Sequence, residues 1–197
     1  MRIPFALLAS LAVLLGLETH ASAQSSTTQW KASASITFAG TSTLHDWSGT
    51  VKAQPFITTV GMTDADKPSS ITAKVEVKTV EMDTKEPKRD ENMRKAMRAV
   101  DFPLVTGEFD TQFSQLISGT GTSPQVLPFK LTILGKTQSA TGTISNWKQQ
   151  GDSASFELDF DVSMKAYGIK VPSVMLVIRV GDVVKVHAKV TLEKVNA

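Results

Sequence analysis

Alternation of apolar and polar residues with a period of two dominates the C-terminal part of the chain. From residue 156 to 164, every even position is apolar and every odd position is polar. Residues 184–193 repeat this pattern. A period of two is typical of a β-strand with one face in water. The Gly181-Asp182 pair predicts a turn, with a further strand at residues 174–180 before it, so we expect a β-meander here.

Weaker alternation recurs through the rest of the chain, between clusters of Gly, Pro, Ser, Asp and Asn. The segments with this pattern are residues 30–38, 43–55, 71–80, 105–113, 126–133 and 137–147. With the three C-terminal strands they make about nine short strands, the number typical of a β-sandwich or a β-barrel.

One segment, residues 87–99, has the features of a helix. It begins with a proline, which suits the first helical turn, and it places Glu91 four residues before Lys95, a spacing that favours an ion pair. Its apolar stripe consists of Met93, Met97 and Val100. We expect this helix to lie with its stripe across the mouth or the flank of the sheet structure.

The N-terminus has the pattern of a secretory signal peptide. Arg2 precedes an apolar run at residues 3–17, which is too short to span a bilayer as a helix, and Ala21-Ser22-Ala23 follows. We therefore expect residues 1–23 to be cleaved, residues 24–197 to form one domain, and the product to be periplasmic. The chain has no cysteine, so its stability must come from a core rather than from disulfides.

The composition argues against two classes of ligand. The formal net charge is only +2, with basic and acidic residues intermixed, which is not typical of a protein that binds nucleic acid. Apart from the leader, the histidines are His45 and His187, and with no cysteine they are a poor basis for a metal site. We expect neither a metal nor a nucleic-acid partner.

Four segments, taken in order, carry a resemblance to a known family. They are residues 36–51, residues 89–103, the turn Leu131-Thr132-Ile133-Leu134-Gly135-Lys136-Thr137, and residues 167–173. Together they resemble the YceI family of bacterial envelope proteins, whose barrels bind isoprenoid lipids. The resemblance implies an all-β fold: an antiparallel lipocalin-like β-barrel of about eight strands with one short α-helix near the barrel mouth. One segment departs from the family, because the Ser42–Trp47 corner is shorter than the aromatic-rich segment of other members.

Whether such a barrel is hollow depends on its inward side chains, because a barrel of about eight strands can be filled or can hold one small ligand. Small residues occur at several inward positions: Ala32, Ala34, Ala73, Gly107, Ala140, Gly142 and Ala188. They would leave space along one side. In the alternative, they mark corners, bulges and close strand approaches in a solid barrel.

The leading hypothesis is an exported carrier that encloses an isoprenoid lipid, an isoprenoid quinone or a similar fatty amphiphile and needs no other cofactor. It would serve transport, storage or an envelope stress response, without catalysis. From strand parity, the helix stripe and the family fold, the residues expected to line its cavity are Phe38, Trp47, Val75, Val77, Met93, Met97, Phe109, Leu131, Ile133 and Phe160. Transient contact of the charged helix with a membrane surface stays open, as does the oligomeric state, a dimer included.

Two other hypotheses belong to different classes of protein. One is a solid-cored envelope stress or interaction protein that acts through its surface. The other is a hydrolase or isomerase that uses His45 beside Asp46. Neighbours on a strand point to opposite faces, so we interpret this pair as part of a corner before Trp47, with Asp46 accepting hydrogen bonds from nearby backbone N–H groups.

Overall fold

The computed structural model describes residues 26–63, 65, 67–112, 125–170 and 179–196. The expected signal peptide and most of the strand predicted at residues 174–180 lie outside these residues. The strands are β1 (Thr27–Ser42), β2 (Trp47–Lys52), β3 (Phe56–Met62), β4 (Pro68–Lys78), β5 (Leu104–Gln112), β6 (Gln125–Ile133), β7 (Lys136–Gln150), β8 (Ser153–Ser163) and β9 (Val180–Lys194). A 3₁₀ turn, η1 (Thr79–Glu81), and one helix, α1 (Pro87–Ala96), connect β4 to β5.

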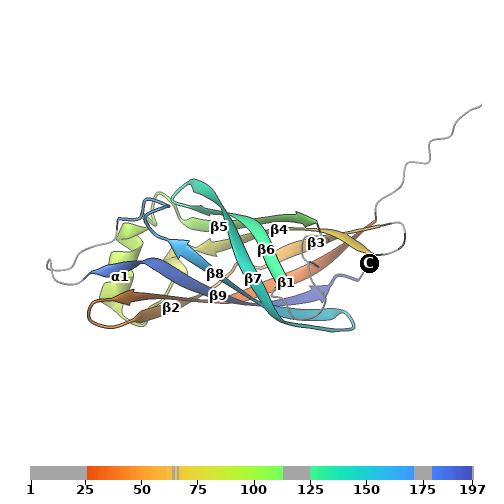
Figure 1. Ribbon diagram of the computed structural model, residues 1–197, viewed down its shortest axis with the longest axis horizontal. Helices are drawn as coiled ribbons and strands as arrows, with labels where there is room; N and C mark the ends of the chain where they lie inside the picture. The colour runs from red at the N-terminus through yellow and green to blue at the C-terminus, as the bar shows by residue number, and fades with distance from the viewer. Residues whose placement is uncertain (1–25, 64, 66, 113–124, 171–178, 197) are drawn as a thin grey trace, which may run out of the picture.

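The long strand β1 closes the sheet into a barrel. One edge of β1 pairs with β9 from Trp30–Lys194 to Ser42–Val180. Its other edge pairs first with β3 and then with β2. The remaining neighbours follow chain order from β3 to β9, and every pairing is antiparallel. The result is a closed eight-stranded antiparallel barrel with β2 as one extra strand and α1 at one end (Figure 1), which confirms the predicted fold class.

Two details of the strand prediction are wrong. Strand β3 was not predicted, and the expected turn at Gly181-Asp182 lies inside β9. Asp182 is held against the end of β8: its carboxylate accepts hydrogen bonds from Ser163 Oγ (2.7 Å) and Lys165 N (2.8 Å), and its carbonyl accepts one from Met164 N (2.9 Å). The two side-chain bonds hold the pKa of the Asp182 carboxyl below its usual value.

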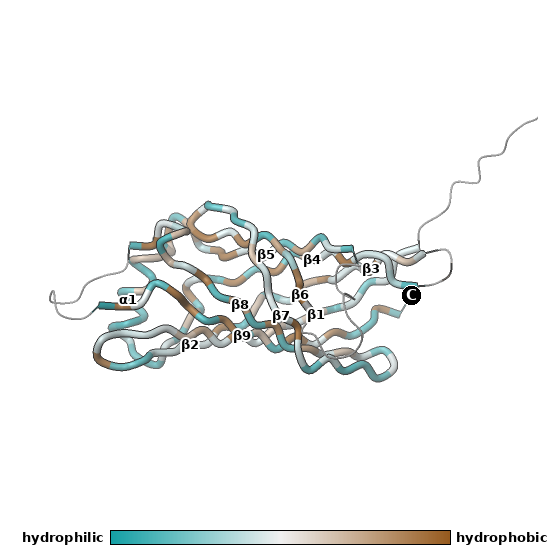
Figure 2. Tube along the Cα trace, in the orientation of Figure 1, coloured by the Kyte–Doolittle hydropathy of each residue, from teal (hydrophilic) through white to brown (hydrophobic). Residues whose placement is uncertain are grey.

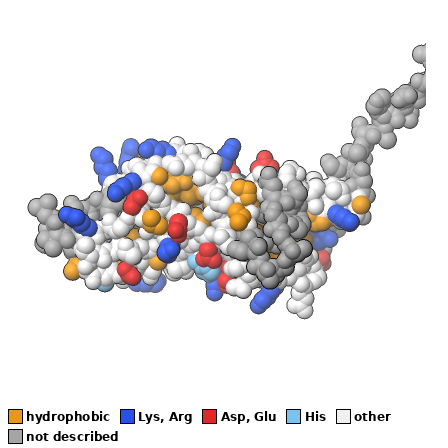
Figure 3. Space-filling view, viewed as in Figure 1, with side chains coloured by type: hydrophobic (Ala, Val, Ile, Leu, Met, Phe, Trp, Pro, Cys, Tyr) orange, Lys and Arg blue, Asp and Glu red, His pale blue; other side chains and the backbone are white. Residues whose placement is uncertain are grey.

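The period-two pattern buries apolar side chains and exposes polar ones, as in β8, where Leu158 and Val162 are buried and Asp159 and Asp161 are exposed. Hydrophobic and hydrophilic residues follow one another along the strand traces in Figure 2. On the outer face of β8 and β9, opposite charges sit on paired positions. His187 Nδ1 lies 2.8 Å from Asp159 Oδ1 on the neighbouring strand, consistent with the polar face predicted for His187. Both basic and acidic side chains occur on the face shown in Figure 3.

Helix α1 is shorter than predicted. Pro87 begins it, as expected, but it ends at Ala96, with Met97 as the C-cap. Arg98 then takes a φ of +47°, which turns the chain away from the helix axis. Val100 therefore does not continue the apolar stripe and is 96% exposed, contrary to the prediction.

Candidate ligand-binding cavity

The half of the barrel nearest α1 contains a cavity of about 670 Å³. The small inward residues Ala34, Gly107 and Ala188 lie on its wall. At the other half, buried side chains that do not line the cavity fill the interior, among them Ala32, Leu127, Ala154 and Leu192. The barrel is hollow at the helix end and filled at the opposite end.

All ten residues that the sequence predicted to line a cavity lie on the wall of this one: Phe38, Trp47, Val75, Val77, Met93, Met97, Phe109, Leu131, Ile133 and Phe160. They come from β1, β2, β4, β5, β6, β8 and the α1 region. Their contact with a ligand stays a prediction. Apolar lining residues that were not predicted include Ile36, Val51, Phe129, Met164, Ile169 and Val184.

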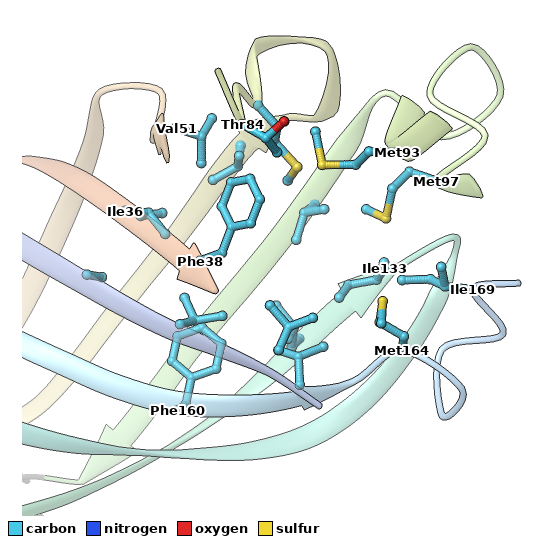
Figure 4. A pocket seen from close by; sticks show the side chains of 18 of the residues that line it. Ile36, Phe38, Val51, Thr84, Met93, Met97, Ile133, Phe160, Met164 and Ile169 are labelled. Carbon is cyan, nitrogen blue, oxygen red and sulfur yellow. The ribbon is translucent and has the colours of Figure 1, made fainter. Parts of the chain in front are cut away.

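Helix α1 forms one side of the cavity. Met93 and Met97 point from the helix toward it, and Ile133, Met164 and Ile169 lie across from them (Figure 4). The thioether side chains are flexible and polarisable, so this side can adapt to ligands of different shape. A hydrogen bond from Ile169 N to Met164 O (2.9 Å) fixes the turn after β8 that carries the facing residues.

Three phenylalanines from different strands pack together in the wall. Phe109 of β5 stacks on Phe129 of β6, with ring centroids 4.9 Å apart, and Phe160 of β8 meets Phe129 edge to face at 5.1 Å. Such aromatic pairs add stability beyond the area that they bury. The cluster joins β5, β6 and β8 within the cavity wall.

A buried carboxylate fixes α1 over the barrel. Asp90 is 7% exposed, and its Oδ1 accepts hydrogen bonds from Thr84 N (2.9 Å) and Thr84 Oγ1 (2.7 Å). Thr84 belongs to the segment that leads from η1 into the helix, and it lines the cavity. The contact anchors the first turn of α1 and so sets which helix face is turned inward.

The cavity also has a polar rim, which the sequence analysis did not identify. We define the rim as Ser42 and His45 from the β1–β2 corner with Glu86, Lys88, Arg89 and Asn92 at the start of α1. The apolar criterion used for the prediction excluded them. The helical spacing of Arg89 and Asn92 relative to Met93 would have placed both on the same face.

The β1–β2 corner does not have the expected hydrogen bonds. Ser42 Oγ accepts one from His45 N (3.3 Å) and donates one to His45 O (2.7 Å), whereas within the described residues Asp46 makes no hydrogen bond. Ser42 thus takes the role predicted for Asp46, because its hydroxyl can both donate and accept across the turn. Nor does any described carboxylate hydrogen-bond to the His45 ring, so the geometry gives no support to a His–Asp catalytic pair.

The described residues contain no group of three or more His, Cys, Asp or Glu side chains arranged to hold a metal ion. In the same part of the chain, no helix is long and apolar enough to cross a membrane.

The fold and the cavity together define a class: lipocalin-like antiparallel barrels with a hollow interior and one helix at the barrel end. The model of the YceI-like domain matches residues 20–192, and the chain belongs to this family.

Solved structures agree with this fold. Burkholderia cenocepacia BcnA aligns with a TM-score of 0.61 at 16% identity, covering 80% of this chain and 95% of that one. A polyisoprenoid binding domain from Saccharophagus degradans, implicated in plant cell wall breakdown, aligns with a TM-score of 0.56 at 9% identity, covering 83% and 97%. No curated protein matches the sequence.

Proposed function

We propose that this protein is a non-catalytic carrier of an isoprenoid or similar amphiphilic lipid, whose tail occupies the cavity. The observation that carries the proposal is the cavity of about 670 Å³ itself, which is lined mostly by apolar side chains and whose polar lining residues, apart from Thr84, belong to the rim. Binding pockets for small molecules have volumes of roughly 300–1,000 Å³ and mostly apolar walls. The Saccharophagus degradans structure, a polyisoprenoid binding domain of the same fold, supports this choice of ligand class.

The volume sets a size for the tail. A water-sized group takes up roughly 30 Å³ in a liquid. The cavity of about 670 Å³ therefore has room for about 20 methylene-sized groups of that volume, or about four isoprene units. Burying each methylene contributes about 0.8 kcal/mol. Affinity should therefore rise with tail length up to about four units and then level off, because further units would extend into water.

The same proposal includes export. The Arg2 and apolar leader pattern with Ala21-Ser22-Ala23 supports secretion and cleavage before Gln24. A lipid tail has to be shielded from water between membranes, and a carrier in the periplasm would do this for transport, storage or an envelope stress response. The mass of the protein from the bacterial envelope tests the cleavage: a mature chain should begin at Gln24.

The test of the function is native mass spectrometry of protein purified from the bacterial envelope, followed by extraction and mass analysis of released molecules. A polyprenyl or quinone species at one per chain is the expected result. A parallel titration with prenyl alcohols of two to six isoprene units should show the plateau at about four. Protein that carries no lipid and takes up none of these alcohols would overturn the proposal in favour of an interaction protein that acts through its surface.

A further inference from the structure

The cavity-facing stripe of α1 changes character along the helix. Its members are Arg89, Asn92, Met93, Ala96 and Met97, which follow the spacing i, i+3, i+4, i+7 and i+8 of one helix face. The first two are polar and the last three are apolar. The helix thus presents a polar end at the rim and an apolar end over the cavity. An amphiphile lying along this face would have its headgroup beside the polar residues and its tail beside the apolar ones.

The two polar members are partly buried and unpaired. Arg89 and Asn92 line the cavity, yet within the described residues neither side chain makes a hydrogen bond, an ion pair or a ring contact. The other basic residues on this helix differ: Lys88 and Lys95 both contact Glu91, and Arg94 Nη2 lies 3.5 Å from Met82 O. Partial removal of a guanidinium from water without a partner is unfavourable. A ligand oxygen placed between Arg89 and Asn92 would compensate for that loss.

The charges at the rim favour an anionic group. The planar N–H donors of the Arg89 guanidinium fit the two oxygens of a carboxylate or a phosphate. Lys88 adds positive charge nearby, although it is shared with Glu91 at 2.7 Å. The opposing charge is Glu86, which is exposed and therefore screened by solvent. His45, from the β1–β2 corner, also lies at the rim and supplies a ring nitrogen.

We propose that Arg89, assisted by Asn92, forms a headgroup site for an oxyacid group, phosphate or carboxylate, at the end of an amphiphile whose tail lies in the cavity. This inference rests on the proposed carrier function and adds the headgroup class to it. It predicts that the protein prefers an acidic lipid to the alcohol with the same tail.

The experiment compares three probes that share one four-isoprene tail: geranylgeraniol, its monophosphate and geranylgeranoic acid. Dissociation constants are measured by calorimetry for the mature wild-type protein and for Arg89→Gln, Arg89→Lys and Lys95→Gln. Lys95→Gln is the matched control, because it removes one charge from the same helix at a residue that does not line the cavity.

We expect the wild type to bind at least one acidic probe roughly tenfold or more tighter than the alcohol, the range for charge-assisted hydrogen bonds. Arg89→Gln should abolish the preference for the acidic probe over the alcohol, Arg89→Lys should keep part of it, and Lys95→Gln should keep it. A preference for the monophosphate alone assigns a phosphate headgroup, and equal preference for both acids assigns oxyanions in general.

Equal wild-type affinity for all three probes would overturn the headgroup site while leaving the carrier function standing. A loss of preference in Lys95→Gln as large as in Arg89→Gln would overturn it too, since the helix charge rather than the rim would then be responsible. Wild-type protein that binds none of the three would refute the carrier function itself.

Discussion

The ring of Phe38 occupies the space that a side chain at Gly49 would need. The two residues are directly paired across β1 and β2, and a Cβ atom on Gly49 would lie 2.4 Å from Cζ of Phe38. The next inward pair repeats the arrangement, with Trp47 packed over Gly40 at the same calculated separation. Packing over the two glycines therefore holds Phe38 and Trp47 in place where β1 and β2 border the cavity. The Phe38 and Trp47 rings meet edge to face, with their centroids 6.4 Å apart.

Gly49→Ala should destabilise the protein by roughly 1–3 kcal/mol, because the added methyl forces Phe38 out of its position in a packed wall. Chemical denaturation followed by tryptophan fluorescence measures the change. Ser48→Ala is the matched control, since Ser48 is an exposed neighbour on the same strand. A Gly49→Ala protein as stable as the control would show that Phe38 can move freely and that the close packing is unimportant.

A large side chain introduced into the cavity should weaken lipid binding while the protein still folds. Ala188 is 6% exposed and lies on the cavity wall in β9. Ala188→Phe places a ring in the cavity, so binding of a four-isoprene alcohol should weaken at least about tenfold, since several methylene groups lose their room. Titration calorimetry gives the affinity, and circular dichroism checks the fold.

The outward neighbour Lys189 provides the control, because Lys189→Phe adds the same ring outside the barrel. Ala34→Leu, on the adjacent strand β1, is a milder variant if Ala188→Phe fails to fold. Unchanged affinity in a folded Ala188→Phe protein would mean that the tail binds elsewhere.

The strand positions of the cavity wall could be predicted because side chains alternate strictly between the two faces of a strand. Once the apolar face is known to point inward, Phe109, Leu131 and Phe160 must share the interior, whatever the exact register. The helix residues Met93 and Met97 followed from the same reasoning with the helical period. The family resemblance supplied what alternation alone left open, namely the choice of barrel over sandwich.

Other features depended on tertiary contacts that no local pattern contains. Gly181-Asp182 has the composition of a turn, but hydrogen bonds from the end of β8 hold Asp182 in β9. Val100 fits the helical period, but the positive φ of Arg98 ends the stripe before it. The rim residues were not predicted for a different reason. Arg89 is charged, and the prediction considered only apolar residues as cavity lining, so it left out the polar end of the helix stripe.

Asp90→Ala should release the first turn of α1 from the barrel. Both hydrogen bonds from Thr84 to the Asp90 side chain go to Oδ1, and their loss leaves the Thr84 N–H group without a partner, at a cost of about 1–3 kcal/mol, and the Thr84 hydroxyl with only a long 3.5 Å hydrogen bond to Glu86 O. Hydrogen exchange of the α1 amides should accelerate more than that of the β8 and β9 amides. Asp90→Asn keeps an acceptor oxygen in this position and should stay close to wild type; equal acceleration in both variants would contradict the role assigned to Oδ1.

Glu91 should titrate at unusually low pH. Hydrogen bonds from Lys88 and Lys95 lower the pKa of its carboxyl from 4.5 to about 2. Because the folded-state value is the lower one, the contribution of these ion pairs to stability is complete above about pH 4.5 and is lost as the pH falls toward 2. The group is on the surface, so salt at about 1 M should raise its pKa toward the ordinary value.

Carbon-detected NMR of the Glu91 carboxyl measures this titration directly. The double variant Lys88→Gln with Lys95→Gln should return the midpoint to about 4.5 at low salt, and each single variant should fall between the two limits, because both lysines hydrogen-bond to the same carboxylate. A wild-type midpoint that already equals that of the double variant would show that the two lysines do not hold the carboxylate in solution. In that case the Lys88 ammonium at the rim would not be paired with Glu91, and the charge available to an acidic headgroup would be larger than Arg89 alone provides.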